Sequence, residues 1–189
     1  MEYTWKQYYA NISITGLDKL KNSGDSQIID FVKSKVKNAE RTLADQLGTG
    51  LFSNGTDAKA LVGLRVAAAN SNTVGGIAQS SFSFWNVQKD SSTATLSLAA
   101  LKTNYESATI DADKPSVGIT TRAIHNSFWN LLQPQQRYTD AKTASAGFEN
   151  IMFMGIPMIV DSHCPTSHLF FLNEKYVSLF VHRDADMKF

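Results

Sequence analysis

Four residues whose side chains can bind a metal or transfer a proton lie within one stretch of the chain, GIPMIVDSHCPTSHLFFLN, residues 155–173. They are Asp161, His163, Cys164 and His168. A carboxylate oxygen, two imidazole nitrogens and a thiolate form a ligand set that zinc accepts in proteins. A metal-dependent enzyme that uses Asp161, His163 and His168 is therefore one hypothesis for the function.

The spacing of these residues nevertheless favours a turn between two strands. It matches neither the helical HExxH pattern nor a pair of CxxC motifs. Pro165 lies among them, and ligands on so short a turn point in different directions. Asp161 and Ser162 are also residue types that turns use to bond neighbouring backbone N–H groups. We therefore expect a turn that holds no metal, no cofactor and no catalytic residue.

Other catalytic patterns are weaker still. No GxSxG motif or known protease signature surrounds Cys164, which is expected to be an inert thiol. The glycine-rich pieces GTGLFSNG and VGGIAQSS lack the terminal Lys-Ser/Thr of a phosphate-binding loop, so they are interpreted as turns. His125 is expected at the rim of a helix. The sequence therefore favours a protein that is not an enzyme.

The composition excludes several classes of partner. The chain has 189 residues, 43% of them hydrophobic and 11% aromatic, which is typical of a folded globular protein. Its formal net charge is +1 without a basic block, so specific nucleic-acid binding is not expected. Its single cysteine cannot form an internal disulfide. No apolar run approaches the roughly 20 residues that span a bilayer, so no membrane partner is expected.

The first part of the chain carries two periodic patterns. Residues 3–15, YTWKQYYANISIT, alternate between apolar and polar positions, which predicts a strand with one apolar face. From Gln27 to Leu47, apolar residues recur every three or four positions, which predicts a long amphipathic helix that Gly48 ends. The segment between them, GLDKLKNSGDS, is interpreted as a polar break. Residues 70–95 are expected to form an irregular connection anchored by Phe82, Phe84 and Trp85.

The second part mixes helices and strands. A helix is expected at 96–108, with Leu98, Leu101 and Tyr105 on one face. A second is expected after a cap at Thr120 or Thr121 and until Pro134, with a core face of Ile124, Phe128, Leu131 and Leu132. Short strands are expected at SVGIT (116–120) and in the four pieces ENIMFMG, IPMIVDS, HLFFLN and YVSLFVH. This order lacks the regular βαβ alternation of a doubly wound fold, so the fold class is α+β.

An apolar-faced strand near the start of the chain and a long surface helix suit a protein that contacts other copies of itself. The candidate subunit-contact residues are Trp5, Tyr8, Ile12 and Ile14.

Several blocks of the chain, in one order, resemble the major capsid proteins of tailed bacteriophages. They are TWKQYYANISITGLDKLKNSG, LFSNGT with LVGLRVA, TVGGIAQSSFSFW, SVGITTRAIHNSFWNLLQPQQRY and GFENIMFMGIPMIVDSHCPTSHLFFLNEKYVSLFVH. The resemblance covers essentially the whole chain. It implies the Hong Kong 97-type capsid fold and a structural role in the phage head shell.

The resemblance also implies a division into parts. Residues 1–22 are similar to the returning strand of the extended loop that lies over a neighbouring subunit. Residues 23–63 and 148–189 are similar to the peripheral domain, with its spine helix at 26–47. Residues 64–147 are similar to the axial domain around the hexamer or pentamer axis. The family pattern has further sequence at both ends, so the chain resembles a core truncated at both ends.

The implied partners are other copies of the chain in hexamers and pentamers, together with a scaffolding protein, the portal and non-specifically packaged DNA. The implied location is the virion, with assembly in the cytoplasm of the bacterial host. Besides the metal-dependent enzyme, another phage head module that binds or decorates the shell remains an alternative.

Overall fold

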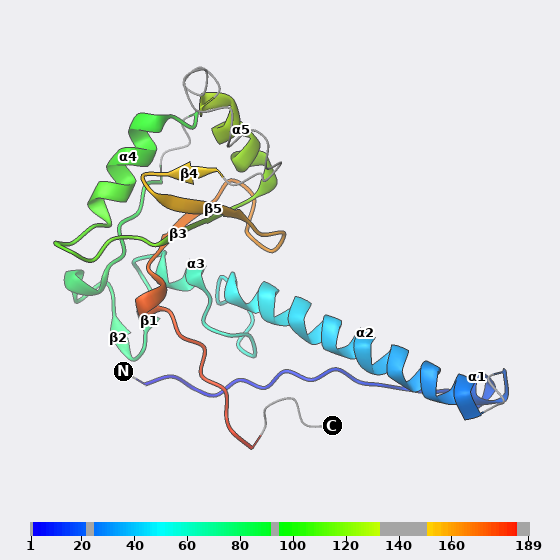
Figure 1. The fold of residues 1–189 in the computed structure, drawn as a ribbon. Helices are drawn as coiled ribbons and strands as arrows, with labels where there is room; N and C mark the ends of the chain where they lie inside the picture. The colour runs from blue at the N-terminus through cyan, green and yellow to red at the C-terminus, as the bar shows by residue number, and fades with distance from the viewer. Residues whose placement is uncertain (1, 22–24, 92–94, 133–150, 185–189) are drawn as a thin grey trace. The chain divides into compact units, whose positions relative to one another are not determined.

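The computed structural model describes residues 2–21, 25–91, 95–132 and 151–184. They belong to two compact units, Met1–Asn86 and Val87–Phe189 (Figure 1). Helices and strands are both present, which confirms the α+β class.

The first unit is organised by the long helix α2, Asp25–Leu51. The apolar spacing predicted this helix, but its predicted end at Gly48 is wrong, because the helix continues for another three residues. Gly50 instead allows a close approach: a Cβ there would lie 2.5 Å from the Tyr8 hydroxyl oxygen. Before α2, the expected polar break contains the short helix α1, Gly16–Lys21. Thr15 starts α1, since its hydroxyl accepts a hydrogen bond from the Asp18 amide at 3.2 Å.

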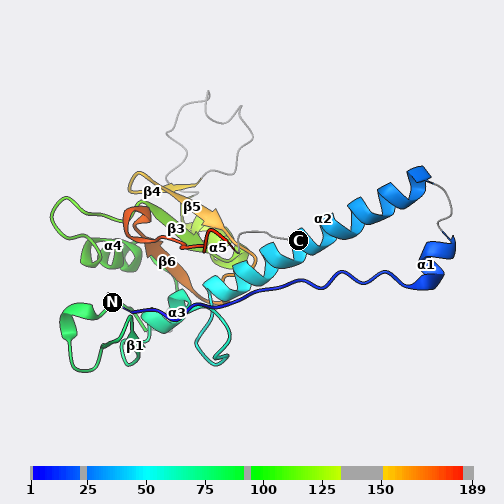
Figure 2. The same ribbon diagram turned by 90° about the horizontal axis from the view of Figure 1, so that it is seen from below.

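Residues 2–15 are extended and run alongside α2 in both ribbon views (Figure 1, Figure 2). The expected strand at 3–15 is wrong in one respect, because these residues pair with no other strand among the described residues. Its neighbour is a helix, whose backbone groups already bond one another and cannot complete a ladder. The predicted alternation is confirmed: Tyr8, Ala10, Ile12 and Ile14 are half-buried, and the odd-numbered residues are exposed.

The rest of the first unit is a set of turns held by buried polar groups. It contains α3, Leu64–Ala67, the hairpin strands β1, Thr73–Val74, and β2, Ile77–Ala78, and a 3-10 turn, Ser83–Trp85. Gly75 and Gly76 both have positive φ, 61° and 81°, as a two-residue type I′ hairpin requires. The Gln79 side chain is 2% exposed and donates to the Ala67 carbonyl at 2.8 Å.

The aromatic anchoring expected in this region is only partly present. The Trp85 indole N–H donates to the Val74 carbonyl at 3.0 Å and ties the 3-10 turn to the hairpin. Phe82 and Phe84 do not anchor the connection, since they are 49% and 76% exposed. Their rings contact each other, with centroids 5.8 Å apart.

Within the described residues, the second unit contains a four-stranded sheet and two α-helices. Its elements are α4, Leu98–Ser107; β3, Val117–Thr120; α5, Arg122–Leu132; β4, Met152–Phe153; β5, Ile156–Val160; and β6, Leu169–Leu172. The strand order is β4-β5-β3-β6 (Figure 2). β3 is parallel to β5, with Ile119 opposite Ile159, and antiparallel to β6, with Ile119 opposite Phe170.

The core of the second unit is an aromatic cluster between the helices and the sheet. Tyr105 of α4 and Phe128 of α5 both meet Phe153 edge-on, with ring centroids 6.2 and 5.7 Å apart. Leu101, Ile151, Ile156 and Met158 complete the buried cluster. The apolar faces predicted for both helices are therefore confirmed. His125 was expected at the rim of its helix, which is wrong: it lies one turn before Phe128 and is 5% exposed.

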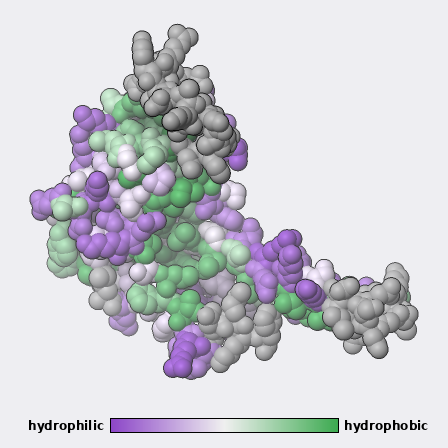
Figure 3. All heavy atoms as spheres, viewed as in Figure 1, coloured by the Kyte–Doolittle hydropathy of each residue, from purple (hydrophilic) through white to green (hydrophobic). Residues whose placement is uncertain are grey.

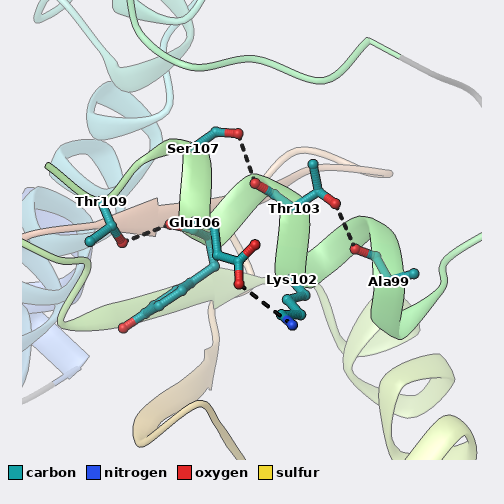
Figure 4. Close-up of polar contacts among 7 residues, drawn as sticks. Ala99, Lys102, Thr103, Glu106, Ser107 and Thr109 are labelled. Atoms are coloured by element: carbon teal, nitrogen blue, oxygen red, sulfur yellow. Dashed lines mark hydrogen bonds and ion pairs between the residues drawn. The ribbon is translucent and has the colours of Figure 1, made fainter.

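The exposed side of α4 satisfies its polar groups locally (Figure 4). Thr103 donates to the Ala99 carbonyl at 3.1 Å, and Ser107 donates to the Thr103 carbonyl at 2.8 Å. The Lys102 ammonium lies 3.6 Å from the Glu106 carboxylate one turn later. Both ends of that pair are exposed, so it contributes little to stability.

One expectation about the last part of the chain differs from the structure. YVSLFVH was expected to be a strand, which is wrong: it begins in a 3-10 turn, Glu174–Tyr176, and continues without strand pairing among the described residues. The pairing of β3 with β5 and β6 joins residues before and after the boundary expected between 147 and 148 in one sheet. The end of α5 at Pro134 lies outside the described residues.

Candidate subunit-contact surface

The N-terminal segment, residues 2–15, has two different rows of side chains. The even-numbered row faces its own chain. The Tyr8 hydroxyl accepts a hydrogen bond from the Leu61 amide at 3.0 Å, and the Lys6 ammonium donates to the Ala58 carbonyl. A groove of about 220 Å³ lies between residues 9–13 and α2, with Lys35 and Thr42 in its helical wall.

The odd-numbered row carries three aromatic residues that are largely exposed. Tyr3, Trp5 and Tyr9 are 55%, 70% and 78% exposed. Isolated apolar residues are ordinary on protein surfaces, whereas three aromatic rings along one extended segment form a surface that a partner can cover. Figure 3 shows that hydrophobic residues reach the surface of both units among hydrophilic ones.

The structure divides the four predicted contact residues between these rows. Trp5 belongs to the exposed row. Tyr8, Ile12 and Ile14 are half-buried in their own chain. Tyr3 and Tyr9 were not among the predicted contact residues, although aromatic residues recur at odd positions of the sequence as well.

The residues of the alternative metal-site hypothesis do not converge. The Asp161 carboxylate accepts a hydrogen bond from the His163 amide at 2.8 Å, and His163 Nδ1 lies 3.1 Å from the same oxygen. His168 turns away: its Nδ1 lies 2.8 Å from the Thr166 carbonyl, and its ring stacks on Phe170. Within the described ranges, no three His, Cys, Asp or Glu side chains are placed to hold a metal ion.

The stretch around Asp161 is a turn that joins β5 to β6, as predicted. The Asp161 amide donates to the Thr120 carbonyl at 3.0 Å, and the Thr120 hydroxyl donates to the His168 carbonyl at 3.0 Å. Both ends of the turn are therefore attached to β3. Cys164 is buried, and burial, followed by the nearby Asp161 carboxylate, raises its thiol pKa from 9.0 to about 11. A thiol with this pKa is a poor nucleophile at neutral pH.

A second polar cluster joins residues that are distant in sequence. Asp113, in the loop after α4, contacts Lys175 and Tyr176 in the 3-10 turn after β6. No motif marks these residues, since about sixty positions separate them. Only the pairing of β3 with β6 brings the loop and the turn together.

Comparison of the chain with protein-family models, with curated proteins and with solved structures finds no match. Among the described residues, no helix has the length and apolar character needed to cross a bilayer.

Proposed function

We propose that this chain is a structural subunit of a tailed-bacteriophage head, a major capsid protein of the Hong Kong 97-type. In this role it assembles with other copies into hexamers and pentamers that enclose the DNA genome. The observation that carries the proposal is the N-terminal segment, which runs alongside α2 (Figure 1), half-buries one row of side chains and exposes Tyr3, Trp5 and Tyr9. The ordered blocks of the sequence supply the resemblance to the family.

The two-sided character of this segment suits a contact between copies. Its inner row fixes the backbone, so little conformational entropy is lost when the outer row is covered. Aromatic residues are enriched at protein interfaces because they bury large areas. An extended backbone outside any sheet can also form main-chain hydrogen bonds with a neighbour.

Under this proposal, the segment corresponds to the extended-loop strand that lies over a neighbouring subunit, and α2 corresponds to the spine helix. A chain with a net charge of +1 also suits a wall built from many copies, because neighbours do not repel one another strongly. The other proposed partners are a scaffolding protein, the portal and DNA that is contacted without sequence specificity.

The exposed aromatic row provides a direct test. Trp5→Ser and Tyr9→Ser should each weaken self-association about tenfold or more, because large aromatic anchors often contribute 2 kcal/mol or more to an interface. Sedimentation velocity across a concentration series measures the association, and thermal unfolding measures the fold. The melting temperature should change little, since both side chains are largely exposed.

Phe84→Ser is the matched control. Phe84 is 76% exposed and belongs to the same unit, but it lies outside the N-terminal segment. It should leave self-association unchanged. Equal losses in all three variants would show general surface stickiness, and no loss in the Trp5 and Tyr9 variants would refute the proposed contact.

A further inference from the structure

A run of exposed apolar residues follows the 3-10 turn after β6. Val177, Leu179, Phe180 and Val181 are 46%, 59%, 81% and 56% exposed. Burying such side chains is favourable by about 1.5–3 kcal/mol each, so a segment free to move would tend to collapse onto apolar surface. The exposure of residues 177–181 is therefore best explained by contacts that fix the direction in which the chain leaves the 3-10 turn.

The Asp113 carboxylate contacts both residues that precede this run. One oxygen lies 3.1 Å from the Lys175 ammonium, and the other accepts a short hydrogen bond from the Tyr176 hydroxyl. These contacts lower the pKa of Asp113, the Tyr176 bond more than the Lys175 bond. The Lys175 ammonium also lies 5.1 Å from the centre of the Tyr176 ring, so the three groups form one cluster.

Both sides of this cluster are held by the backbone. Asp113 is paired with Ile110 through two main-chain hydrogen bonds of 2.9 Å, which fix the loop that carries the carboxylate. On the other side, the Glu174 amide donates to the Ser116 hydroxyl at 3.0 Å, and the Ser116 amide donates to the Leu172 carbonyl at 2.8 Å. The carboxylate therefore connects a fixed loop to the turn from which the apolar run departs.

We propose that Asp113 is a positioning residue that latches the 174–176 turn and so holds Val177–Val181 extended and exposed for contact with a second copy of the chain. The contact with a second copy rests on the proposed function, whereas the latch rests on the geometry of the cluster. Lys175 and Tyr176 are the other two members of the latch.

Hydrogen exchange on the full chain, at a concentration where it is monomeric, tests the latch. Asp113→Asn removes the charge, and Tyr176→Phe removes only the hydroxyl. Because exposed charged contacts contribute modestly, each variant should speed exchange at the Lys175, Tyr176 and Val177 amides by about two- to fivefold. These amides bond Asn173 and Glu174 within the turn, so their exchange reports its opening.

Asp111→Asn is the matched control, because it removes the same charge from the same exposed loop outside the cluster. It should leave exchange at the three amides unchanged. Equal exchange in the Asp113→Asn and Asp111→Asn variants would overturn the latch, as would an unchanged rate in Tyr176→Phe.

Self-association of the same variants tests separately whether the latch presents Val177–Val181 to a second copy. Weaker association in Asp113→Asn than in Asp111→Asn would support presentation of Val177–Val181 to a second copy. Faster exchange with unchanged association would overturn that presentation. A parent chain that never self-associates would refute the proposed function instead.

Discussion

Cys164 shows how its surroundings decide what a reactive residue type can do. The sequence places it beside two histidines and an aspartate, a combination found in metal sites and in catalytic pairs. In the structure, burial and the Asp161 carboxylate both favour the neutral thiol. The Asp161 carboxylate accepts a hydrogen bond from the His163 amide, as a turn residue does.

Cys164 should therefore react slowly with iodoacetamide in the folded protein between pH 7 and 9, and rapidly after denaturation. The sign of the pH effect follows from the raised pKa. Above pH 9 the unfolded chain ionises its thiol, whereas the folded chain does so only near pH 11, so the free energy of unfolding falls over this interval. Mass spectrometry of alkylated samples measures the rate, and fast labelling of the folded protein at pH 8 would contradict this account.

Asp113 should titrate below its ordinary pKa of 3.8. The lowered pKa means that the latch contributes stability above pH 3.8 and loses it as the pH falls through the folded value. A carbon-13 NMR titration of the carboxyl group measures this, and Tyr176→Phe should move the pKa back toward 3.8 because the Tyr176 bond is its largest cause. A titration at or above 3.8 in the parent chain would refute the cluster.

At the scale of elements, the sequence predicted the helices and their buried faces, because these depend on the spacing of apolar residues along the chain. The stripe from Ile28 to Leu47 was enough to predict α2, and Leu101 with Tyr105 was enough to predict the buried face of α4. The strand at 3–15 failed because its alternation describes faces and does not encode a pairing partner. The strand predicted at YVSLFVH is wrong for the same reason, although its residue types favour strands.

Gly63 tests how the turn after α2 is packed. Its φ of −79° suits any residue, so the requirement for glycine is steric. A Cβ there would lie 2.5 Å from the Ser53 carbonyl oxygen and 2.9 Å from that of Gly50, so Gly63→Ala should cost about 1–3 kcal/mol or more. Chemical denaturation measures the loss. Gly16→Ala, with no atom within 4 Å of the added carbon, should cost nothing, and equal stability of the two variants would contradict the packing.

At the scale of the whole molecule, the proposed function rests on the resemblance carried by the ordered blocks of sequence. No single residue pattern predicted it, and the most reactive cluster proved to be a turn. The proposed subunit contact depends on which side of the extended segment its own chain covers, and only the structure shows that Tyr8, Ala10, Ile12 and Ile14 are the half-buried row. The exposed row of Tyr3, Trp5 and Tyr9 therefore replaces the predicted apolar row as the principal proposed contact.

Electron microscopy of the purified protein across a concentration series is the decisive measurement for the proposed self-assembly. The images should show hexameric or pentameric rings or closed shells, which Trp5→Ser should disperse and Phe84→Ser should preserve. Single chains at every concentration would contradict the proposed role as a shell subunit.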